Sequence, residues 1–252
     1  MGRLQSKVAI VTGASAGIGR ATARLFASEG ARVVVGARRR AELDSLVDEI
    51  KGAGGEAVAV AGDVRDEAFH QALVRAAVDN YGRLDIAFNN AGVSPKRTPL
   101  ADLAEEAFDA ALNTNVRGIF IAMKHEIRAM LKTGGGSIVN TGSVTSTIVV
   151  PHMAAYCTSK HALAGLTKAA ALDYAAQNIR VNLVAPGPVD TQMLRDGAAA
   201  TEQGREMIVS STPMRRISRP EEIAAAVVWV ASSAASYLTG AILPVDGGYT
   251  LP

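Results

Sequence analysis

Short runs of β-branched and other apolar residues alternate along this chain with longer segments in which apolar residues recur every three or four positions. Uninterrupted short runs are typical of strands buried on both faces, and the longer pattern is typical of amphipathic helices. The predicted strands are 7–11, 32–36, 57–61, 84–88, 137–141, 179–184 and 242–245. Because helical patterns separate them, we expect an α/β fold, a doubly wound parallel sheet of about seven strands with right-handed crossovers and helices on both faces.

An uncharged segment in the middle of the chain ends at a single lysine. No Asp, Glu, Lys or Arg lies between residues 132 and 160, and a helical pattern from Met153 puts Tyr156 and Lys160 one turn apart on one face. A poorly hydrated ammonium lowers the pKa of a nearby phenol, ordinarily ~10, because it favours the phenolate. The pair predicts a general acid/base, and Ser143, just after a predicted strand, is placed to orient a reacting oxygen.

The first predicted strand leads directly into a glycine-rich turn followed by a helical pattern. Glycines allow a backbone to approach a ligand closely, and the free N–H groups of a helix start favour a pyrophosphate. The spacing of Gly13, Gly17 and Gly19 departs from the G-x-G-x-x-G fingerprint, but the strand, turn and helix still predict a dinucleotide site. The residues assigned to it here are Gly13, Ser15, Gly17, Ile18 and Gly19.

The end of the second predicted strand indicates which dinucleotide binds. An NAD site usually has a carboxylate here, whereas this chain has Gly36-Ala37-Arg38-Arg39-Arg40. Guanidinium groups match phosphate geometry, and no carboxylate repels a 2′-phosphate. We therefore predict NADP(H), with Arg38 as the main contact, Arg39 or Ser15 assisting, and Arg40 at a solvated helix start.

Taken together, these motifs resemble the short-chain dehydrogenase/reductase family over essentially the whole chain. The resemblance rests on the TGxxxGxG turn Thr12–Gly19, on Asn89-Asn90-Ala91-Gly92, and on Ser143, Tyr156 and Lys160 at their spacing. It implies a single Rossmann-like domain, 1–252, and reversible hydride transfer between nicotinamide and a ketone or secondary alcohol. In reduction, Tyr156 would donate the proton, and Lys160 would also bind the nicotinamide ribose.

The resemblance also assigns roles that the residues alone do not. Asn115, in Asn113-Thr-Asn115-Val-Arg-Gly118, becomes a fourth catalytic residue that holds a water in a proton relay through Lys160. Asp63 and Val64 are expected beside the adenine. Further cofactor contacts are expected from Asn90, Ala91, Gly92, Pro186, Gly187, Val189 and Thr191.

Two loops are expected to shape the substrate cleft. Residues 94–100 contain two prolines, and residues 192–213 show weak periodicity, as in a lid that closes over substrate. A plain surface excursion is the alternative for 192–213. The substrate residues predicted here are Ser94, Thr145, Val150, His152, Met153 and Met193.

Composition narrows the remaining possibilities. The net charge of +2 argues against nucleic acid as a partner, and no apolar run is long enough to span a membrane. One Cys excludes an internal disulfide and suits the cytoplasm. The four His share no ligand spacing, so no metal is expected, and Cys157 is expected to pack. The resemblance implies a homo-oligomer, and we predict a homotetramer.

Three hypotheses for function remain open at this point. The first is an NADPH-dependent carbonyl reductase or alcohol dehydrogenase for a largely apolar small molecule. The second is a 3-oxoacyl-(acyl-carrier-protein) reductase, for which Lys124 and Arg128 are candidates to dock an acidic carrier. The third is a regulatory NADP(H)-binding protein without turnover, against which the intact set of catalytic residues argues.

Overall fold

The computed structural model describes residues 2–251 and contains one parallel sheet of seven strands in the order β3-β2-β1-β4-β5-β6-β7. The strands are β1 Val8–Thr12, β2 Arg32–Ala37, β3 Glu56–Ala61, β4 Ile86–Asn89, β5 Gly136–Thr141, β6 Ile179–Pro186 and β7 Ile242–Val245. The chain winds from β1 outward to β3 and then from β4 outward to β7. The predicted doubly wound sheet is confirmed, with its topological switch between β1 and β4.

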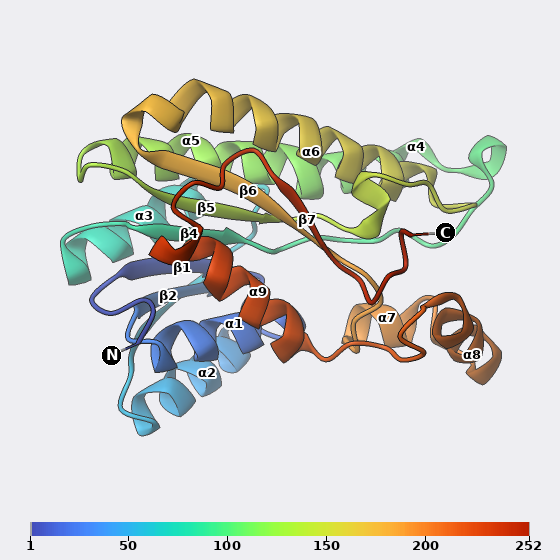
Figure 1. The fold of residues 1–252 in the computed structure, drawn as a ribbon, viewed down its shortest axis with the longest axis horizontal. Coiled ribbons are helices and arrows are strands. Elements are labelled where there is room, and N and C mark those ends of the chain that lie inside the picture. The colour runs from blue at the N-terminus through green and yellow to red at the C-terminus, as the bar shows by residue number, and fades with distance from the viewer. Residues whose placement is uncertain (1, 252) are drawn as a thin grey trace.

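Helices cover both faces of this sheet (Figure 1). On one face lie α1 Gly17–Ser28, α2 Arg40–Gly52 and α9 Pro220–Ala231, and on the other α3 Glu67–Tyr81, α5 Gly118–Leu131 and α6 Ala154–Tyr174. The shorter α4, Glu105–Leu112, packs against α6. Each βα unit therefore places its helix on one or the other side, as a parallel sheet requires.

The burial of the β1 side chains explains why the strands appear in the sequence as unbroken apolar runs. Ala9 and Val11 belong to the core beneath α1, α2 and α9, whereas Val8 and Ile10 belong to the core beneath α3, α5 and α6. Successive side chains of a strand point to opposite faces, so a central strand between two helical layers must be apolar at every position. The carboxyl ends of all seven strands then share one edge.

Strand β4 begins later than the predicted 84–88 because a side chain takes part of the strand's pairing. The Asp85 carboxylate accepts a hydrogen bond from the Val8 backbone N–H at 3.0 Å and is paired with Arg83. Asp85 N–H in turn donates to Val8 O at 2.9 Å. Sequence patterning cannot separate such a bridging residue from the strand proper.

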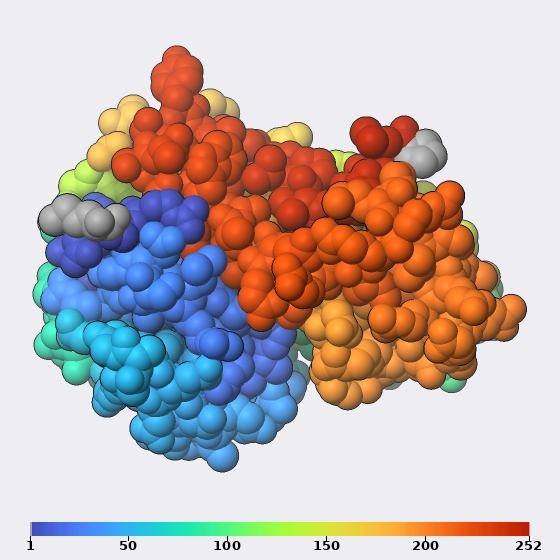
Figure 2. Space-filling model, turned by 60° about the horizontal axis from the view of Figure 1, so that its bottom comes forward, coloured from blue at the N-terminus to red at the C-terminus, as the bar shows by residue number. Residues whose placement is uncertain are grey.

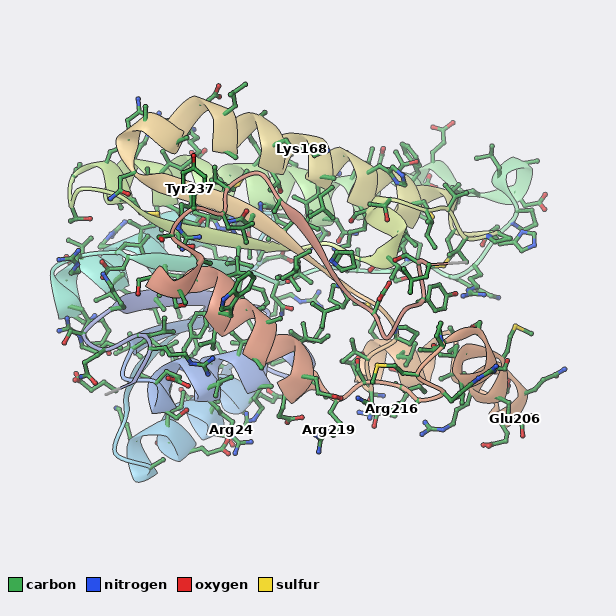
Figure 3. All side chains as sticks on the ribbon, in the orientation of Figure 1. Arg24, Lys168, Glu206, Arg216, Arg219 and Tyr237 are labelled. Atoms are coloured by element: carbon green, nitrogen blue, oxygen red, sulfur yellow. The ribbon has the colours of Figure 1, made fainter. Side chains whose placement is uncertain are left out.

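Residues 192–213, predicted as a lid or an excursion, contain α7 Gln192–Asp196 and α8 Glu202–Ser211. They form the orange lobe beside the blue N-terminal segments in Figure 2. Asp190 N–H donates to Ser218 O at 2.8 Å, which ties the two ends of the excursion together. Arg216, labelled in Figure 3, pairs with Glu222 in the first turn of α9. The two ends of residues 192–213 are thus held close together where the segment leaves and rejoins the rest of the domain.

Candidate active site

The predicted Ser143, Tyr156 and Lys160 come together at the carboxyl edge of β5. Ser143 follows the last residue of β5, Thr141, by one glycine, and the first turns of α6 carry Tyr156 and Lys160. Lys160 is 3% exposed; its Nζ donates to Thr141 O at 2.7 Å and lies 5.6 Å from the centre of the Tyr156 ring. A lysine from α6 is therefore bound to the strand end beside the tyrosine.

The titration behaviour of this pair differs in one respect from the sequence prediction. Burial raises the pKa of Tyr156, and the interaction of its phenol with the Ser143 side chain acts in the opposite direction. Burial also lowers the pKa of Lys160 to about 8. The net shift of the phenol pKa is therefore upward, opposite to the predicted lowering, because burial outweighs the Ser143 interaction. The phenol thus stays protonated over a wider pH range than a free tyrosine.

Asn115 lies in a five-residue π-helical turn, Asn113–Arg117, that joins α4 to α5. Its Oδ1 accepts from Val93 N–H at 2.8 Å, and its Nδ2 donates to Val93 O at 2.9 Å and to Ser159 Oγ at 3.0 Å. Both amide protons are therefore used by protein atoms, and the side chain clamps the segment after β4 to α6. The water relay assigned to Asn115 stays a prediction.

The glycine turn has the shape that a phosphate needs. Gly13 and Gly17 adopt φ of 65° and 54°, a region that favours glycine. A Cβ on Gly13 would lie 2.8 Å from Asn90 Nδ2, and one on Gly19 would collide with Gly13 O. No side chain caps the start of α1, and its first turn holds no acidic residue. The open helix start and the side-chain-free cradle fit the pyrophosphate of a dinucleotide.

Of the remaining cofactor candidates, Asn90 and Thr191 lie beside this turn, and Gly92 lies beside the Ser143, Tyr156 and Lys160 group. Asn90 Nδ2 donates to Thr12 O at 3.2 Å, which joins the ends of β1 and β4. Gly92 faces Asn115 and Lys160, since a Cβ there would lie 3.1 Å from Asn115 Oδ1 and 3.8 Å from Lys160 Nζ. Thr191 Cγ2 is 3.0 Å from the Cβ position of Gly17. The segment that follows Pro186, the last residue of β6, therefore reaches the glycine turn at Thr191.

The end of β2, where the adenosine phosphate was predicted, carries the predicted arginines, and Arg65, which the sequence analysis did not name, lies next to Asp63. Arg39 Nη2 donates to Ser15 Oγ at 3.0 Å. The Asp63 carboxylate accepts from Arg65 at 2.7 Å; this hydrogen bond is the largest cause that holds the Asp63 pKa low, and Arg38 adds to it. Arg40 begins α2 and pairs with Asp44, as its predicted surface position requires. The basic character of this end is therefore retained, with Arg65 partnering Asp63.

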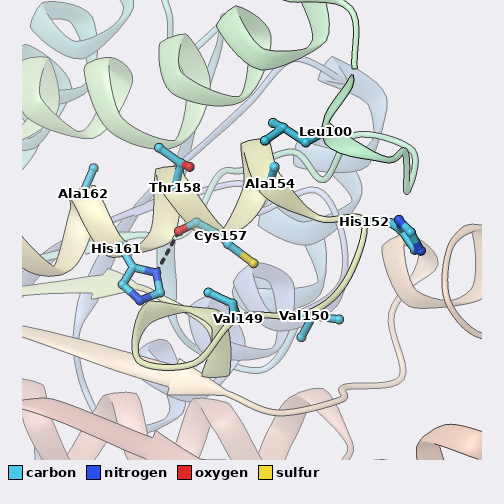
Figure 4. A pocket seen from close by; sticks show the side chains of 9 residues that line it. All are labelled: Leu100, Val149, Val150, His152, Ala154, Cys157, Thr158, His161 and Ala162. Atoms are coloured by element: carbon cyan, nitrogen blue, oxygen red, sulfur yellow. Dashed lines mark hydrogen bonds between the residues drawn. The ribbon is translucent and has the colours of Figure 1, made fainter. Parts of the chain in front are cut away.

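The substrate candidates do not form one cluster. Val150 and His152 line a cavity of about 670 Å³ with Leu100, Val149 and one side of α6 (Figure 4). Cys157 and His161 line it too, about 100° around the helix from Tyr156 and Lys160. Neither Ser143, Tyr156 nor Lys160 is among its lining residues.

The other candidates occupy different surroundings. Thr145 is buried, and its hydroxyl has no hydrogen-bond partner among the described residues. Met193 is exposed on α7, whereas Met153 precedes α6 and Ser94 lies in the 94–100 loop. His152 has φ of 64°, and its carbonyl accepts from Thr98 N–H at 2.8 Å, which ties the loop before α6 to the 94–100 loop. Of the predicted substrate residues, the cavity of Figure 4 is lined only by Val150 and His152.

Comparisons with known proteins identify the class to which this fold and site belong. The family model described as "Enoyl-(Acyl carrier protein) reductase" matches residues 13–250. The chain belongs to the short-chain dehydrogenase/reductase family.

Two curated relatives extend along nearly the whole chain. An A-factor type gamma-butyrolactone 1′-reductase (1S-forming) from Streptomyces virginiae is 45% identical, over 99% of this chain and 98% of the relative. A 3-oxoacyl-(acyl-carrier-protein) reductase from Thermotoga maritima is 39% identical, over 99% and 100%. Each alignment therefore includes every motif described above.

Solved structures agree with this assignment. A short-chain type dehydrogenase/reductase from Mycobacterium marinum superposes with a TM-score of 0.93 at 37% identity, over 99% of this chain and 97% of that one. A Beutenbergia cavernae protein, proposed to be an NAD(P)-dependent gluconate 5-dehydrogenase and solved with NADP at low occupancy, has a TM-score of 0.93 at 34% identity, over 99% and 98%.

Proposed function

We propose that this protein is an NADP(H)-dependent oxidoreductase that interconverts a ketone and a secondary alcohol on a small, largely apolar molecule. The observation that carries the proposal is the meeting of Ser143, Tyr156 and a buried Lys160 at the strand edge that also holds the glycine turn. Ligands of open parallel sheets bind at this edge, beside the topological switch. The reductase and dehydrogenase relatives support the same reaction class.

The nicotinamide cofactor supplies the hydride in reduction and accepts it in oxidation. Ser143 and Tyr156 hydrogen-bond the carbonyl oxygen, and the Tyr156 proton passes to that oxygen as the carbonyl π bond breaks. The raised pKa of Tyr156 keeps this proton in place at neutral pH. Lys160 retains further N–H donors beyond its bond to Thr141, and we assign them to the nicotinamide ribose.

We assign the adenosine 2′-phosphate to Arg38 and Arg39. Arg39 is held beside the glycine turn through Ser15 and also pairs with Glu42 at 3.3 Å. For Arg38 no ion pair is found within residues 2–251, although its charge helps to lower the pKa of Asp63. Asp63 and Val64 are assigned to the adenine, and Asn90, Ala91, Gly92, Gly187, Val189 and Thr191 to the rest of the cofactor. The NADP seen in the gluconate dehydrogenase-like structure supports this choice.

The proposal extends to the organisation of the protein. We treat 1–252 as one catalytic domain with 192–213 as its substrate lid, and we place the enzyme in the cytoplasm as a homo-oligomer. No helix within residues 2–251 is both long and apolar enough to cross a membrane. The lid assignment is supported by the hydrogen bond between Asp190 and Ser218, which joins the two ends of the segment so that α7 and α8 form a separate lobe.

The test is loss of NADPH absorbance against cyclic ketones, diketones, a sugar and acetoacetyl thioesters, with NADH in parallel. We expect turnover of at least one ketone, and we expect Tyr156→Phe to abolish turnover while NADPH affinity, measured by its fluorescence, stays nearly unchanged. Full activity in the Tyr156→Phe variant would refute the mechanism. NADPH binding without turnover in either direction would favour the non-catalytic hypothesis.

A second candidate function is reduction of a 3-oxoacyl chain on an acyl carrier protein, because a 39% identical relative carries that name. The surface offers little for an acidic carrier near the predicted contacts, since Lys124 is paired with Glu67 at 2.9 Å and Arg128 alone stays exposed. This candidate requires a higher kcat/KM for acetoacetyl carrier protein than for the bare thioester. Equal values would exclude it.

A further inference from the structure

The turn that follows β5 fixes the Ser143 side chain through reciprocal hydrogen bonds. Ser143 precedes a 3₁₀ turn, Val144–Ser146, and its Oγ accepts from Thr145 N–H at 3.2 Å. The Ser143 N–H donates to Ser146 Oγ at 3.1 Å, and Ser146 N–H donates to Ser143 O at 2.8 Å. The arrangement is a capping box, in which each serine satisfies a backbone group of the other.

These bonds determine which hydrogen bonds the Ser143 hydroxyl can still form. One lone pair accepts from Thr145 N–H, so the single hydroxyl proton stays free to be donated. Ser143 also acts on the Tyr156 phenol in the direction that favours the phenolate, as a donor does. The turn therefore holds the Ser143 hydroxyl with its proton unused by the turn itself, so that the proton is available to the phenol or to a reacting oxygen.

Ser146 is the residue of this turn to which the proposed reaction assigns no role. It is 4% exposed and Ser143 is 8% exposed, so without the Ser146 hydroxyl the Ser143 N–H would be buried with no partner. The approach is possible only beside a glycine, because a Cβ on Gly142 would lie 2.7 Å from Ser146 Oγ. Removing Ser146 Oγ frees the backbone of Ser143 to turn toward another partner.

We propose that Ser146 is a positioning residue that acts through Ser143, holding its hydroxyl so that its one proton is donated to Tyr156 in the free protein and to the substrate oxygen when substrate is bound. The expected effect on kcat/KM rests on the proposed ketone and alcohol chemistry. The expected effect on the pKa of Tyr156 can be measured whether or not the protein turns over a substrate.

The kinetic test is a double-mutant cycle. Loss of one buried hydrogen bond predicts that Ser146→Ala lowers kcat/KM about three- to tenfold, with Ser146→Cys, similar in size but a weak acceptor, in between. In a Ser143→Ala background, Ser146→Ala should cause no further loss, because its effect passes through Ser143. Losses that multiply would overturn the proposal. Thr147→Ala is the matched control, since that hydroxyl bonds Val144 O in the same turn.

The second test needs no activity. In protein labelled with ¹³C at tyrosine Cζ, the Tyr156 signal, identified by its absence in Tyr156→Phe, should titrate at higher pH in Ser146→Ala than in the wild type. Thr147→Ala should not move it. An unchanged Tyr156 titration in folded Ser146→Ala refutes the positioning role, whereas a wild type without turnover refutes only the proposed function.

Discussion

At the residue scale, the buried carboxyl of Glu126 is a feature that the proposed reaction does not use. Glu126 Oε2 accepts from Asn89 Nδ2 at 3.0 Å, and the same amide donates to Asn140 Oδ1 at 3.2 Å. Asn140 Nδ2 continues to Thr167 Oγ1 at 3.0 Å. This chain of buried polar groups joins α5, β4, β5 and α6. Burial raises the pKa of Glu126 to about 7, which the bond from Asn89 only partly offsets.

The raised pKa makes stability depend on pH in a defined direction. The carboxyl has an ordinary pKa of 4.5 and a folded value of about 7, so between these the unfolded chain ionises first. The free energy of unfolding should fall by about 3 kcal/mol as pH rises through this window. Glu126→Gln removes the titration, so we expect the variant to gain stability relative to the wild type at pH 8 compared with pH 4.5.

Urea denaturation of both proteins at several pH values measures this difference. Other groups titrate equally in the two chains, so the difference between the wild type and Glu126→Gln isolates the Glu126 contribution. The cost of fitting a second amide beside Asn89 is the same at every pH. A difference that stays constant between pH 4.5 and pH 8 would contradict the buried, neutral carboxyl.

Arg38 carries the prediction of cofactor preference. Replacing Arg38 with Asp removes a cation at the end of β2 and adds a carboxylate that repels a 2′-phosphate and accepts from ribose hydroxyls. We expect the ratio of kcat/KM for NADPH to that for NADH to fall at least tenfold. Arg40→Asp is the control, because Arg40 is exposed at the first position of α2 and already bonds Asp44. Equal ratios in both variants would contradict the assignment of Arg38 as the contact of the 2′-phosphate.

At the scale of elements, the strands and most helices follow from local pattern because they lie between two apolar layers. In β2, Val33 and Val35 enter one core and Val34 the other, so the strand is apolar throughout and its prediction needs no tertiary information. The glycine turn is equally readable, because a positive φ at Gly13 and Gly17 restricts the residue type.

Other elements depend on contacts that no local pattern contains. The π-helical turn 113–117 exists where Asn115 reaches Val93 and Ser159, and a Cβ on Gly118 would lie 2.8 Å from Val64 O. Neither contact is encoded in spacing along the chain. The pairing of Arg65 with Asp63 and the Ser143–Ser146 capping box are local, and the short serine spacing was a signal available in the sequence.

At the scale of the whole molecule, the sheet order explains why so much of the site was predictable. Parallel strands bring every carboxyl end to one edge, so motifs at the ends of β1, β4, β5 and β6 must meet there. The substrate cleft was less predictable, because it depends on how loops 94–100 and 147–153 and the segment 192–213 pack. Val150 and His152 consequently face a cavity that the catalytic residues do not line.

The outer face of α6 carries the last prediction, which concerns assembly. Ala162, Gly165 and Ala169 lie exposed along it, with Leu172 83% exposed at its end and Lys168, labelled in Figure 3, beside them. Exposed apolar residues along one side of a helix favour association. We expect a homo-oligomer, the predicted tetramer, in sedimentation experiments at micromolar concentration, and the monomer alone would refute it.

Gly165 permits a sharp test of that face. A Cβ added there meets nothing within 4 Å in the protomer, so Gly165→Arg costs the fold nothing by collision and removes a helix-destabilising glycine. If the α6 face is the interface, the arginine should shift sedimentation toward smaller species. Because the arginine strains nothing within the protomer, the dissociated variant should stay folded, as its thermal unfolding would show. Gly52→Arg, equally open but on α2, is the matched control and should keep the wild-type assembly. Identical sedimentation of the two variants would place the interface elsewhere, because only α6 distinguishes them.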